Sequence, residues 1–435
     1  MNRKNVDIIQ ASIDYIEDNL KAEISAELLA EKAGFSVFHY YRVFQKIVGI
    51  PVMQYITRRK LLHAAYVIAH GGKVIDTALT YGFGTNAGFY KAFQNEFRCS
   101  PSEYVKKYAV KRPYRMNLKQ EEHRILTKKR INEILIQWDM QKEEISDFYY
   151  AGTDNRADSQ WNVGNRYVMK VGTDIPRLKR HLAISKRIAE QGVRVPLPVK
   201  TKEGFDYHVE GELYYCLECK LEGIPVNARE IYDNLLLAQR IGEAIGKLDL
   251  LLEEYGEPNA YNEPGMLEEL REVAIPRMKT LNCKVPNCFY EEYLNVFSTL
   301  YNGLSKQVIH RDLCPNNFVM NGERLVGITD FEMAEQNIRV YDPCYTAAAI
   351  LSENWGDEKI DQSIWFDILK NILRGYDSIV SLTKEEKRVI PYVIYGMQMC
   401  SVSYFSQMDR FEELAKTNTA MLEWLIENHS RILVC

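Results

Sequence analysis

The stretch VIHRDLCPNNFVM, Val308 to Met320, decides the fold of the larger part of this chain, because it sets polar residues at fixed spacing between strand-like runs. Asp312 is followed five residues later by Asn317, and Asp330 comes thirteen residues after that. The strands predicted for QVIH, FVM and LVGITDF would bring these three side chains together at one opening of the fold. The pattern favours a chemical site over a turn with solvated charges.

The chemistry that this spacing suits is phosphoryl transfer. The reaction needs a carboxylate that orients the attacking hydroxyl and accepts its proton, and it needs oxygen ligands for the Mg²⁺ that neutralises the β and γ phosphates. Asp312 suits the first role. Asn317 and Asp330 suit the second, because Mg²⁺ prefers carboxylate and amide oxygens.

A candidate phosphate anchor lies upstream of this stretch. Lys170, in the strand-like run YVMKV, is placed to bind the α and β phosphates of ATP, and its position before Asp312 favours this role over that of a surface lysine. No G-x-G-x-x-G motif precedes it. Instead, AGTDNRADSQW offers Gly152 and Asn155, whose backbone N–H groups could cap phosphates.

Two lobes are predicted around these residues. A strand-rich segment over about residues 145–225 precedes a mostly helical segment over about residues 226–435. We therefore expect an α+β bilobal, kinase-like domain over residues 131–435. The stretch before it, KRPYRMNLKQEEHRILTKKR at residues 111–130, is charged and without apolar periodicity, which predicts an exposed linker.

The first hundred residues contain one unit twice: GFSVFHYYRVFQ begins at Gly34, and GFGTNAGFYKAFQ begins at Gly82. Each unit is predicted to be a helix, a glycine turn and a second helix. Ser25 is the expected N-cap of the first helix. Ser100 and Glu103 are expected to form a capping box for a closing helix.

The second helix of each unit is amphipathic. Its apolar residues recur at i, i+3, i+4 and i+7 and are expected to face a core. These inward positions are Tyr40, Val43, Phe44 and Ile47 in the first unit, and Phe89, Ala92, Phe93 and Phe97 in the second.

A helix pair of this kind is a helix-turn-helix, whose second helix can enter the major groove of DNA. The alternative is a pair of helical hairpins with solvated charges. The duplication and the long connecting helix PVMQYITRRKLLHAAYVIAH favour DNA reading, so residues 1–110 are predicted to be an all-α domain that binds double-stranded DNA. Cations predicted to be available for phosphates are Arg58, Arg59, Lys60, Lys73, Lys106 and Lys107.

Charge and composition agree with this division. Residues 1–115 hold 17 Lys and Arg and 10 Asp and Glu, a net charge of +7, whereas the whole chain has −4. A basic first part suggests that only this part meets a polyanion. Hydrophobic residues make up 46% of the chain, no stretch suits a membrane helix, and a cytoplasmic protein is expected.

The nine cysteines are interpreted as reduced thiols. A four-thiolate zinc site built from Cys216, Cys219, Cys283 and Cys288 is the alternative. It is disfavoured because YYCLECKL is strand-like and lacks the glycines of a zinc knuckle.

The first part resembles the DNA-binding domain of the AraC/XylS transcription regulators, through LLAEKAGFSVFHYYRVFQKIVG and IDTALTYGFGTNAGFYKAFQNEFRCSPSEY. The resemblance implies two reading helices and the positions at which they contact bases. These positions are Phe38, Tyr41 and Arg42 in the first helix, and Asn86, Ala87, Tyr90 and Lys91 in the second. Tyr41 and Ala87 stand where polar residues are usual, so the operator sequence is not predicted.

From about Phe148 onward the chain resembles the aminoglycoside phosphotransferase family, small-molecule kinases that use ATP and Mg²⁺. The resemblance rests on AGTDN, YVMKV, GVRVPLP, LECKLEG, HRDLCPNNFVM, and ITDFEMA followed by YDPCYTAAAIL. It implies Asp312 as catalytic base, Asn317 and Asp330 as metal ligands, and Lys170 as phosphate anchor. It also implies that LECKLEG, with Glu218 and Lys220, is the hinge that binds adenine.

Two positions depart from the family pattern. His181 stands where a glutamate usually pairs with the strand lysine, and Thr346 stands where an aspartate is common. Glu190 is a candidate substitute for the missing glutamate.

Three functions remain open from the sequence. The first is a transcription regulator whose kinase-like domain senses or phosphorylates a small hydroxylated molecule, with RNA polymerase as a further partner. The second is a small-molecule kinase that uses its DNA-binding domain for autoregulation. The third is a pseudokinase that binds ligands without turnover.

Overall fold

The computed structural model describes residues 3–97, 99–107, 110, 112–113, 115–118, 126, 128–149, 156–253, 255, 265–281, 283–322, 324–407 and 411–432. The chain divides into two compact units, residues 1–149 with 154–164 and residues 150–153 with 165–435. Over the described ranges, no helix has the length and apolar character needed to cross a membrane.

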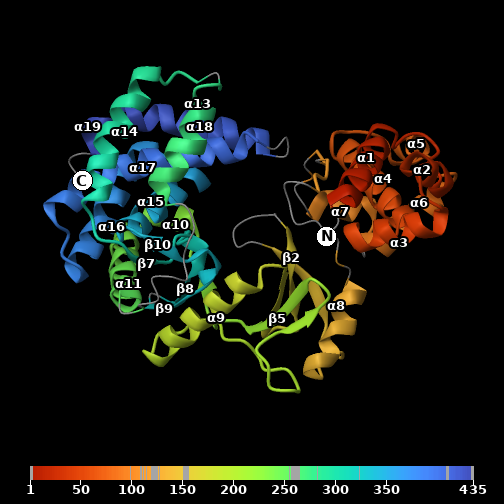
Figure 1. Ribbon diagram of the computed structural model, residues 1–435, viewed down its shortest axis with the longest axis horizontal. Helices are drawn as coiled ribbons and strands as arrows, with labels where there is room; N and C mark the ends of the chain where they lie inside the picture. Colours follow the sequence, from red (N-terminus) through yellow and green to blue (C-terminus); the bar gives the residue numbers. More distant parts are fainter. Residues whose placement is uncertain are drawn as a thin grey trace. The chain divides into compact units, whose positions relative to one another are not determined.

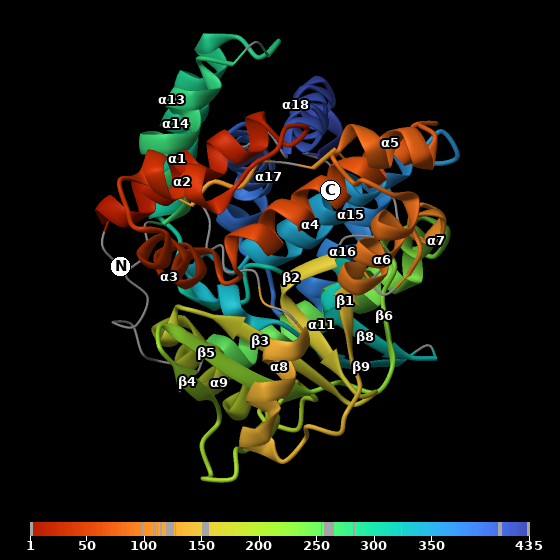
Figure 2. The same ribbon diagram turned by 90° about the vertical axis from the view of Figure 1, so that its right-hand side faces the viewer.

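The first unit begins with helices α1 to α7, coloured red to orange in Figure 1. Their bounds are α1 (Arg3–Asp18), α2 (Ala26–Ala33), α3 (Val37–Val48), α4 (Val52–Ala69), α5 (Val74–Thr80), α6 (Asn86–Phe97) and α7 (Pro101–Lys107). Figure 2 shows α4 between the pair α2–α3 and the pair α5–α6, as expected of a connector between two reading units. We call α1 to α7 the head.

The predicted helix ends are confirmed. The Ser25 hydroxyl caps α2 by accepting the Leu28 backbone N–H at 3.2 Å, and α2 ends at Gly34, whose φ of +68° is a left-handed conformation that suits glycine. Ser100 and Glu103 form the expected capping box, with each backbone N–H donating to the other side chain.

The predicted apolar stripes lie in one core. Tyr40, Phe44, Phe89 and Phe93 are fully buried, and they pack with residues of α1, α2 and α4. The opposite face of α3 is open, and 74% of Phe38 is exposed.

Residues 115–118, which we call the strap, lie against α1. The Gln10 side chain donates to the Met116 carbonyl at 3.0 Å and accepts the Leu118 N–H at 2.7 Å. Arg115 forms ion pairs with Asp14 and Asp18. Met116 is 8% exposed. Within the stretch predicted to be an exposed linker, Met116 is therefore buried, because α1 offers this segment polar partners and an apolar surface.

The remainder of the first unit is short. It contains α8 (Lys128–Ile134), the 3-10 turn η1 (Leu135–Trp138) and the strands β1 (Ile145–Tyr149) and β2 (Arg156–Val163). The two strands pair antiparallel, with Asp147 opposite Trp161.

The second unit is α+β. Its strands and 3-10 turns are β3 (Tyr167–Gly172), β4 (His208–Glu210), β5 (Leu213–Cys219), β6 (Ile224–Pro225), β7 (Gln307–Ile309), η4 (Pro315–Asn317), β8 (Phe318–Asn321), β9 (Arg324–Ile328), η5 (Phe331–Met333), β10 (Glu335–Asn337) and η6 (Gln362–Ile364). Its helices are α9 (Ile175–Glu190), α10 (Ala228–Asp233), α11 (Leu235–Glu253), α12 (Met266–Glu269), the π-helix η3 (Leu270–Ala274), α13 (Ile275–Met278), α14 (Asn287–Asn302), α15 (Tyr341–Glu353), α16 (Trp365–Ile379), α17 (Lys384–Phe405), α18 (Glu412–Glu427) and α19 (His429–Ile432).

The strands of this unit form antiparallel sheets. β3, β5 and β4 lie in this order, with Lys170 opposite Cys216 and Val168 opposite Glu218. β6, β8 and β9 form a second sheet, and β10 pairs with β7. A large apolar core lies among the helices from α10 to α19 (Figure 1). The predicted fold class, an all-α part and an α+β part, is confirmed.

Candidate functional site

The loop after β7 carries Asp312. It is held by hydrogen bonds to Asp342, a fully buried residue at the start of α15. Its carboxylate accepts the backbone N–H groups of His310 and Arg311, each at 2.8 Å. Arg311 has a φ of +70°, which a non-glycine residue adopts only when its surroundings hold it there. Asp342 thus determines the course of the chain into Asp312.

His310 links this loop to the segment after β9. Its Nδ1 atom accepts the Asp312 N–H at 3.3 Å, and its Nε2–H donates to the Thr329 carbonyl at 2.9 Å. Burial lowers the pKa of His310 to about 4, so the imidazole is neutral at pH 7 and serves as one donor and one acceptor.

Asp312 is the carboxylate at the centre of the site. Burial raises its pKa to about 6, and the nearby charge of Asp330 adds to this, whereas a hydrogen bond from the Tyr345 hydroxyl at 2.6 Å opposes it. A carboxylate with a raised pKa is a better proton acceptor than a solvated one, and it remains largely ionised at pH 7.

Asn317 and Asp330 lie beside Asp312. The Asn317 amide donates to the Asp312 carbonyl at 2.7 Å, and its oxygen accepts the Thr329 hydroxyl at 3.1 Å. Asp330 follows Thr329 with a φ of +69° and leads into η5. The structure therefore brings together the three residues that the HRDLCPNN and TDF motifs indicate.

Lys170 on β3 faces the same loops. Its Nζ atom lies 3.2 Å from Asp330, 2.8 Å from Glu332 and 3.5 Å from Glu218. Burial acts to lower the pKa of Lys170, but the charges of Asp330, Glu218 and Glu332 outweigh it and hold this pKa well above its usual value. Three carboxylates around one ammonium group leave a local excess of negative charge.

The expected partner of Lys170 on α9 is absent. Glu190 is exposed and contacts only Arg187 among the interactions described, so the suggestion that it replaces the missing glutamate is wrong. His181 is buried instead, with its Nε2 atom 2.8 Å from Glu218. Glu218, expected at an adenine hinge, directs its carboxylate toward His181 and Lys170.

Of the other predicted cofactor-binding residues, Lys220, Gly152 and Asn155, the structure describes only Lys220. Lys220 is half-buried just after β5, and its backbone N–H donates to the Arg166 carbonyl at 2.8 Å. Gly152 and Asn155 lie outside the described residues. Thr346, which stands in place of an aspartate, donates to the Leu313 carbonyl at 2.7 Å and so supports the same loop.

The donor set suits a cation that the protein shares with a nucleotide. Over the described part of the chain, no three His, Cys, Asp or Glu side chains form a metal cage of their own. Mg²⁺ is typically held by one or two protein oxygens and substrate phosphates, and Asn317 and Asp330 fit that pattern.

Glu332, Tyr345 and Asp342 also belong to this site, although no sequence pattern predicts their contacts. Glu332 follows Asp330 by two residues, and Tyr345 and Asp342 belong to the quoted run YDPCYTAAAIL. The run was recognised as a motif, but nothing in its sequence indicates which residue contacts the base and which one holds the loop.

The positions predicted to contact bases lie on α3 and α6. Phe38 and Arg42 are exposed, with the guanidinium 5.8 Å from the centre of the Phe38 ring, and Tyr41 is half-buried. On α6, Asn86, Ala87 and Lys91 are exposed and Tyr90 is half-buried.

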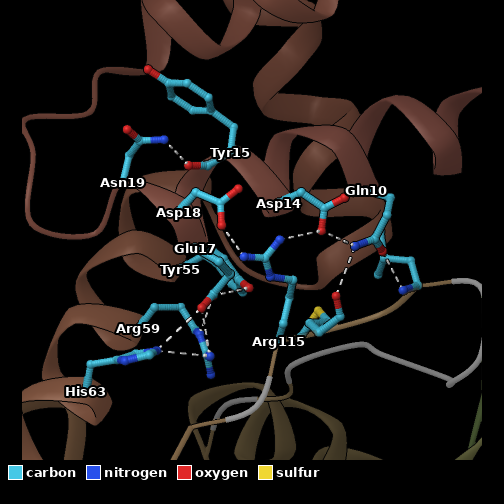
Figure 3. Close-up of polar contacts among 12 residues, drawn as sticks. Gln10, Asp14, Tyr15, Glu17, Asp18, Asn19, Tyr55, Arg59, His63 and Arg115 are labelled. Carbon is cyan, nitrogen blue, oxygen red and sulfur yellow. Dashed lines mark hydrogen bonds and ion pairs between the residues drawn. The ribbon is translucent and has the colours of Figure 1, made fainter. Parts of the chain in front are cut away.

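The cations expected to contact phosphates are only partly available. Arg59 is 7% exposed and donates to Glu17, which also accepts the Tyr55 hydroxyl (Figure 3). Arg58 is paired with Glu96, and Lys60 donates to the Ala22 carbonyl at 3.2 Å. The phosphate role predicted for Arg59 is wrong, because α1 supplies a carboxylate that binds it inside the head.

Comparisons with known families match both parts. A family described as "Helix-turn-helix domain" matches residues 29–107, and one described as "Phosphotransferase enzyme family" matches residues 144–368.

Relatives of the head are transcription regulators. The HTH-type transcriptional activator AarP of Providencia stuartii is 39% identical over 98 residues, which are 22% of this chain and 73% of AarP. The HTH-type transcriptional regulator YbfP of Bacillus subtilis is 36% identical over 97 residues, and this chain spans only 33% of YbfP.

The second unit is similar in fold to a solved kinase. The structure titled "Amicoumacin kinase hAmiN in complex with AMP-PNP, Ca2+ and Ami" matches with a TM-score of 0.52 at 14% identity. The match covers 67% of this chain and 92% of that one.

Proposed function

Because the chain belongs to the phosphotransferase enzyme family and carries an AraC-type helix-turn-helix domain, we propose that it is a transcription regulator with a phosphoryl-transfer domain. That domain binds ATP with Mg²⁺ and phosphorylates a small molecule bearing a hydroxyl group. The observation that carries the proposal is the convergence of Asp312, Asn317 and Asp330 opposite Lys170.

Each residue has a distinct task in this proposal. Asp312 orients the acceptor hydroxyl and takes its proton as the new O–P bond forms and the bond to the β-phosphate oxygen breaks. Asn317 and Asp330 would hold Mg²⁺, which when bound supplies neutralising charge to the phosphates. Lys170 binds the α and β phosphates. Tyr345 holds the Asp312 carboxylate in position through its hydrogen bond.

The decisive experiment is a phosphoryl-transfer assay. Purified full-length protein is incubated with MgATP and a panel of hydroxylated metabolites and antibiotics, and phosphorylated product is detected by mass spectrometry. Asp312→Asn is the inactive control, because a general base typically contributes about 10²- to 10⁴-fold to the rate. Transfer by the wild type and not by the variant supports the proposal. Equal, background-level transfer by both contradicts it and favours a pseudokinase.

The head is proposed to read DNA through α3 and α6, with Phe38, Tyr41, Arg42, Asn86, Ala87, Tyr90 and Lys91 as the base-contacting set. Selection of bound sequences from a random DNA pool tests this directly. Recovery of a defined two-part site supports sequence-specific binding, and recovery of no enriched sequence contradicts it.

Regulation requires that ligands at the kinase-like domain bind two states of the protein unequally. We propose that they change DNA affinity. The test is operator affinity measured at fixed salt with and without MgATP and the identified acceptor. An unchanged dissociation constant would leave the two activities independent.

A further inference from the structure

The buried contact between α9 and β5 is the feature of this site that departs most from the family pattern. His181 is 1% exposed, and Glu218 is 2% exposed. Both side chains are buried, so their interaction lies in the interior of the lobe. It lies immediately beside the amino group of Lys170.

Register explains why Glu218 reaches Lys170. On the antiparallel pair β3 and β5, Lys170 lies opposite Cys216 and Val168 lies opposite Glu218. Lys170 and Glu218 are therefore diagonal neighbours on one face of the sheet, within reach of long side chains. One carboxylate oxygen of Glu218 lies 3.5 Å from the Lys170 Nζ atom, and the other lies 2.8 Å from the His181 Nε2 atom.

The second nitrogen of His181 indicates how this contact is protonated. His181 Nδ1 is buried and has no hydrogen-bond partner within the described part of the chain. A proton there would be a buried donor without an acceptor, which costs more than an unpaired acceptor lone pair on a neutral ring. The Nε2–H of His181 is therefore the donor to Glu218. Burial acts to raise the pKa of Glu218, but Lys170 and His181 outweigh it and lower this pKa, so Glu218 keeps its negative charge beside Lys170.

Glu218 differs from the other two carboxylates at Lys170. Asp330 belongs to the proposed metal site, and the side chains of Asp330 and Glu332 are 31% and 27% exposed, against 3% for Glu218. Charges shielded from water interact more strongly than exposed ones. Glu218 is thus the partner that stays with Lys170 when a nucleotide and its cation engage the other two.

We propose that Glu218, held by His181, is the positioning residue for Lys170, so that the acid usually supplied by the helix after β3 is supplied here by β5. His181 orients this carboxylate and fastens α9 to the sheet. The inference rests on the proposed function, since it assigns Lys170 to the nucleotide phosphates.

The test compares the wild-type protein and its variants in their affinity for MgATP. This affinity is measured on the full-length protein, without an acceptor, by displacement of a fluorescent ATP analogue. Glu218→Gln keeps a hydrogen-bonding group beside His181 but removes the charge. The expected weakening is on the order of 10- to 100-fold, by analogy with the loss seen when a residue that orients a metal ligand is removed. Glu190→Gln, on the exposed face of α9, is the matched control and should bind as the wild type does.

A charge relocation makes the test specific for positioning. His181→Glu combined with Glu218→Gln returns the acid to α9 and should recover most of the lost affinity. Circular dichroism and thermal melting confirm that each variant is folded, and Glu218→Asp, which keeps the charge but shortens its reach, replaces Glu218→Gln if that variant does not fold.

The outcomes separate this inference from the proposed function. Wild-type affinity in Glu218→Gln, or a double variant no better than Glu218→Gln, would overturn the role of Glu218. Nucleotide binding by the wild type without transfer to any acceptor would contradict the proposed function alone.

Discussion

The head and the second unit each bury a cation against carboxylates, and they do so for different ends. Arg59 is 7% exposed and is held by Glu17, which also accepts the Tyr55 hydroxyl. Lys170 is 8% exposed and faces Asp330, Glu332 and Glu218.

This difference separates a structural pair from a binding site. The Glu17–Arg59 pair joins α1 to α4, and its opposite charges satisfy each other. The cluster at Lys170 holds more negative than positive charge, which costs free energy unless a further cation arrives. An excess of like charge in a buried site is therefore evidence of function, whereas a matched pair is evidence of architecture.

Among the changes that compare the two clusters, Asp330→Asn is expected to have the largest effect. Loss of one of the oxygens proposed to bind Mg²⁺ should reduce the transfer rate by about 10²- to 10³-fold, as for other groups that stabilise transition-state charge. The melting temperature should change little, because Lys170 retains Glu332 and Glu218. Steady-state rates and thermal melts provide the measurements, with Asp367→Asn on the exposed face of α16 as control. If Asp330→Asn strongly lowers the melting temperature, the cluster at Lys170 has a structural role instead.

Removal of the Glu17 charge should instead lower the stability of the head. Glu17→Gln leaves Arg59 buried without its carboxylate, which typically costs about 3–5 kcal/mol of unfolding free energy. Denaturant unfolding of the full chain measures this loss in the transition of the head. Glu31→Gln, an exposed change on α2, should be neutral.

The double variant Glu17→Leu with Arg59→Met tests the pair as a unit. Replacement of a whole buried ion pair by apolar side chains is often neutral, so the double variant should be more stable than either single change. A double variant that is less stable than both single variants would show that the pair contributes more to the free energy of unfolding than its matched charges explain.

DNA affinity should distinguish exposed cations of the head from those held in ion pairs. Arg42→Ala and Lys91→Ala remove exposed groups on the reading helices and should each cost about 1–3 kcal/mol of binding to the selected operator. Arg58→Ala, whose side chain is already paired with Glu96, should cost less. Titrations at one salt concentration measure all three, and an equal loss for Arg58 would contradict the distinction.

The smallest effect concerns pH. Burial acts to raise the pKa of Glu17, but hydrogen bonds and charge from His63 and Arg59 outweigh it and lower this pKa below its usual value of 4.5. A depressed folded-state pKa contributes stability that is complete above the unfolded value and is lost as the pH falls through the folded value. The stability difference between wild type and Glu17→Gln should therefore be constant above about pH 5 and shrink below pH 4.5. A difference that does not shrink as the pH falls below 4.5 would show that the charge of Glu17 is not its source.

Local patterns predicted the helix ends of the head, and they indicated the residues that the structure brings together near Lys170. Ser25 and Gly34 mark helix ends because capping depends on a few neighbouring residues. Asn317 and Asp330 lie close together because they flank the antiparallel pair β8–β9, and Asp312 precedes the short turn η4 that leads into this pair.

Features that depend on distant partners were not predictable in this way. Arg59 is an ordinary surface cation by sequence, and its burial depends on Glu17, 42 residues away. The direction of Glu218 depends on the register of β3 against β5, and a shift of one residue would turn it to the other face. The strap depends on Gln10, which lies 106 residues before Met116.

The strap changes where the head ends as a folding unit. A recombinant fragment that stops at Lys107, the last residue of α7, would leave Asp14, Asp18 and Gln10 without the partners supplied by residues 115–118 and would expose the surface that Met116 covers. Fragments intended for crystallography or for DNA titration should extend through Leu118, and shorter ones are expected to melt earlier and to precipitate more readily.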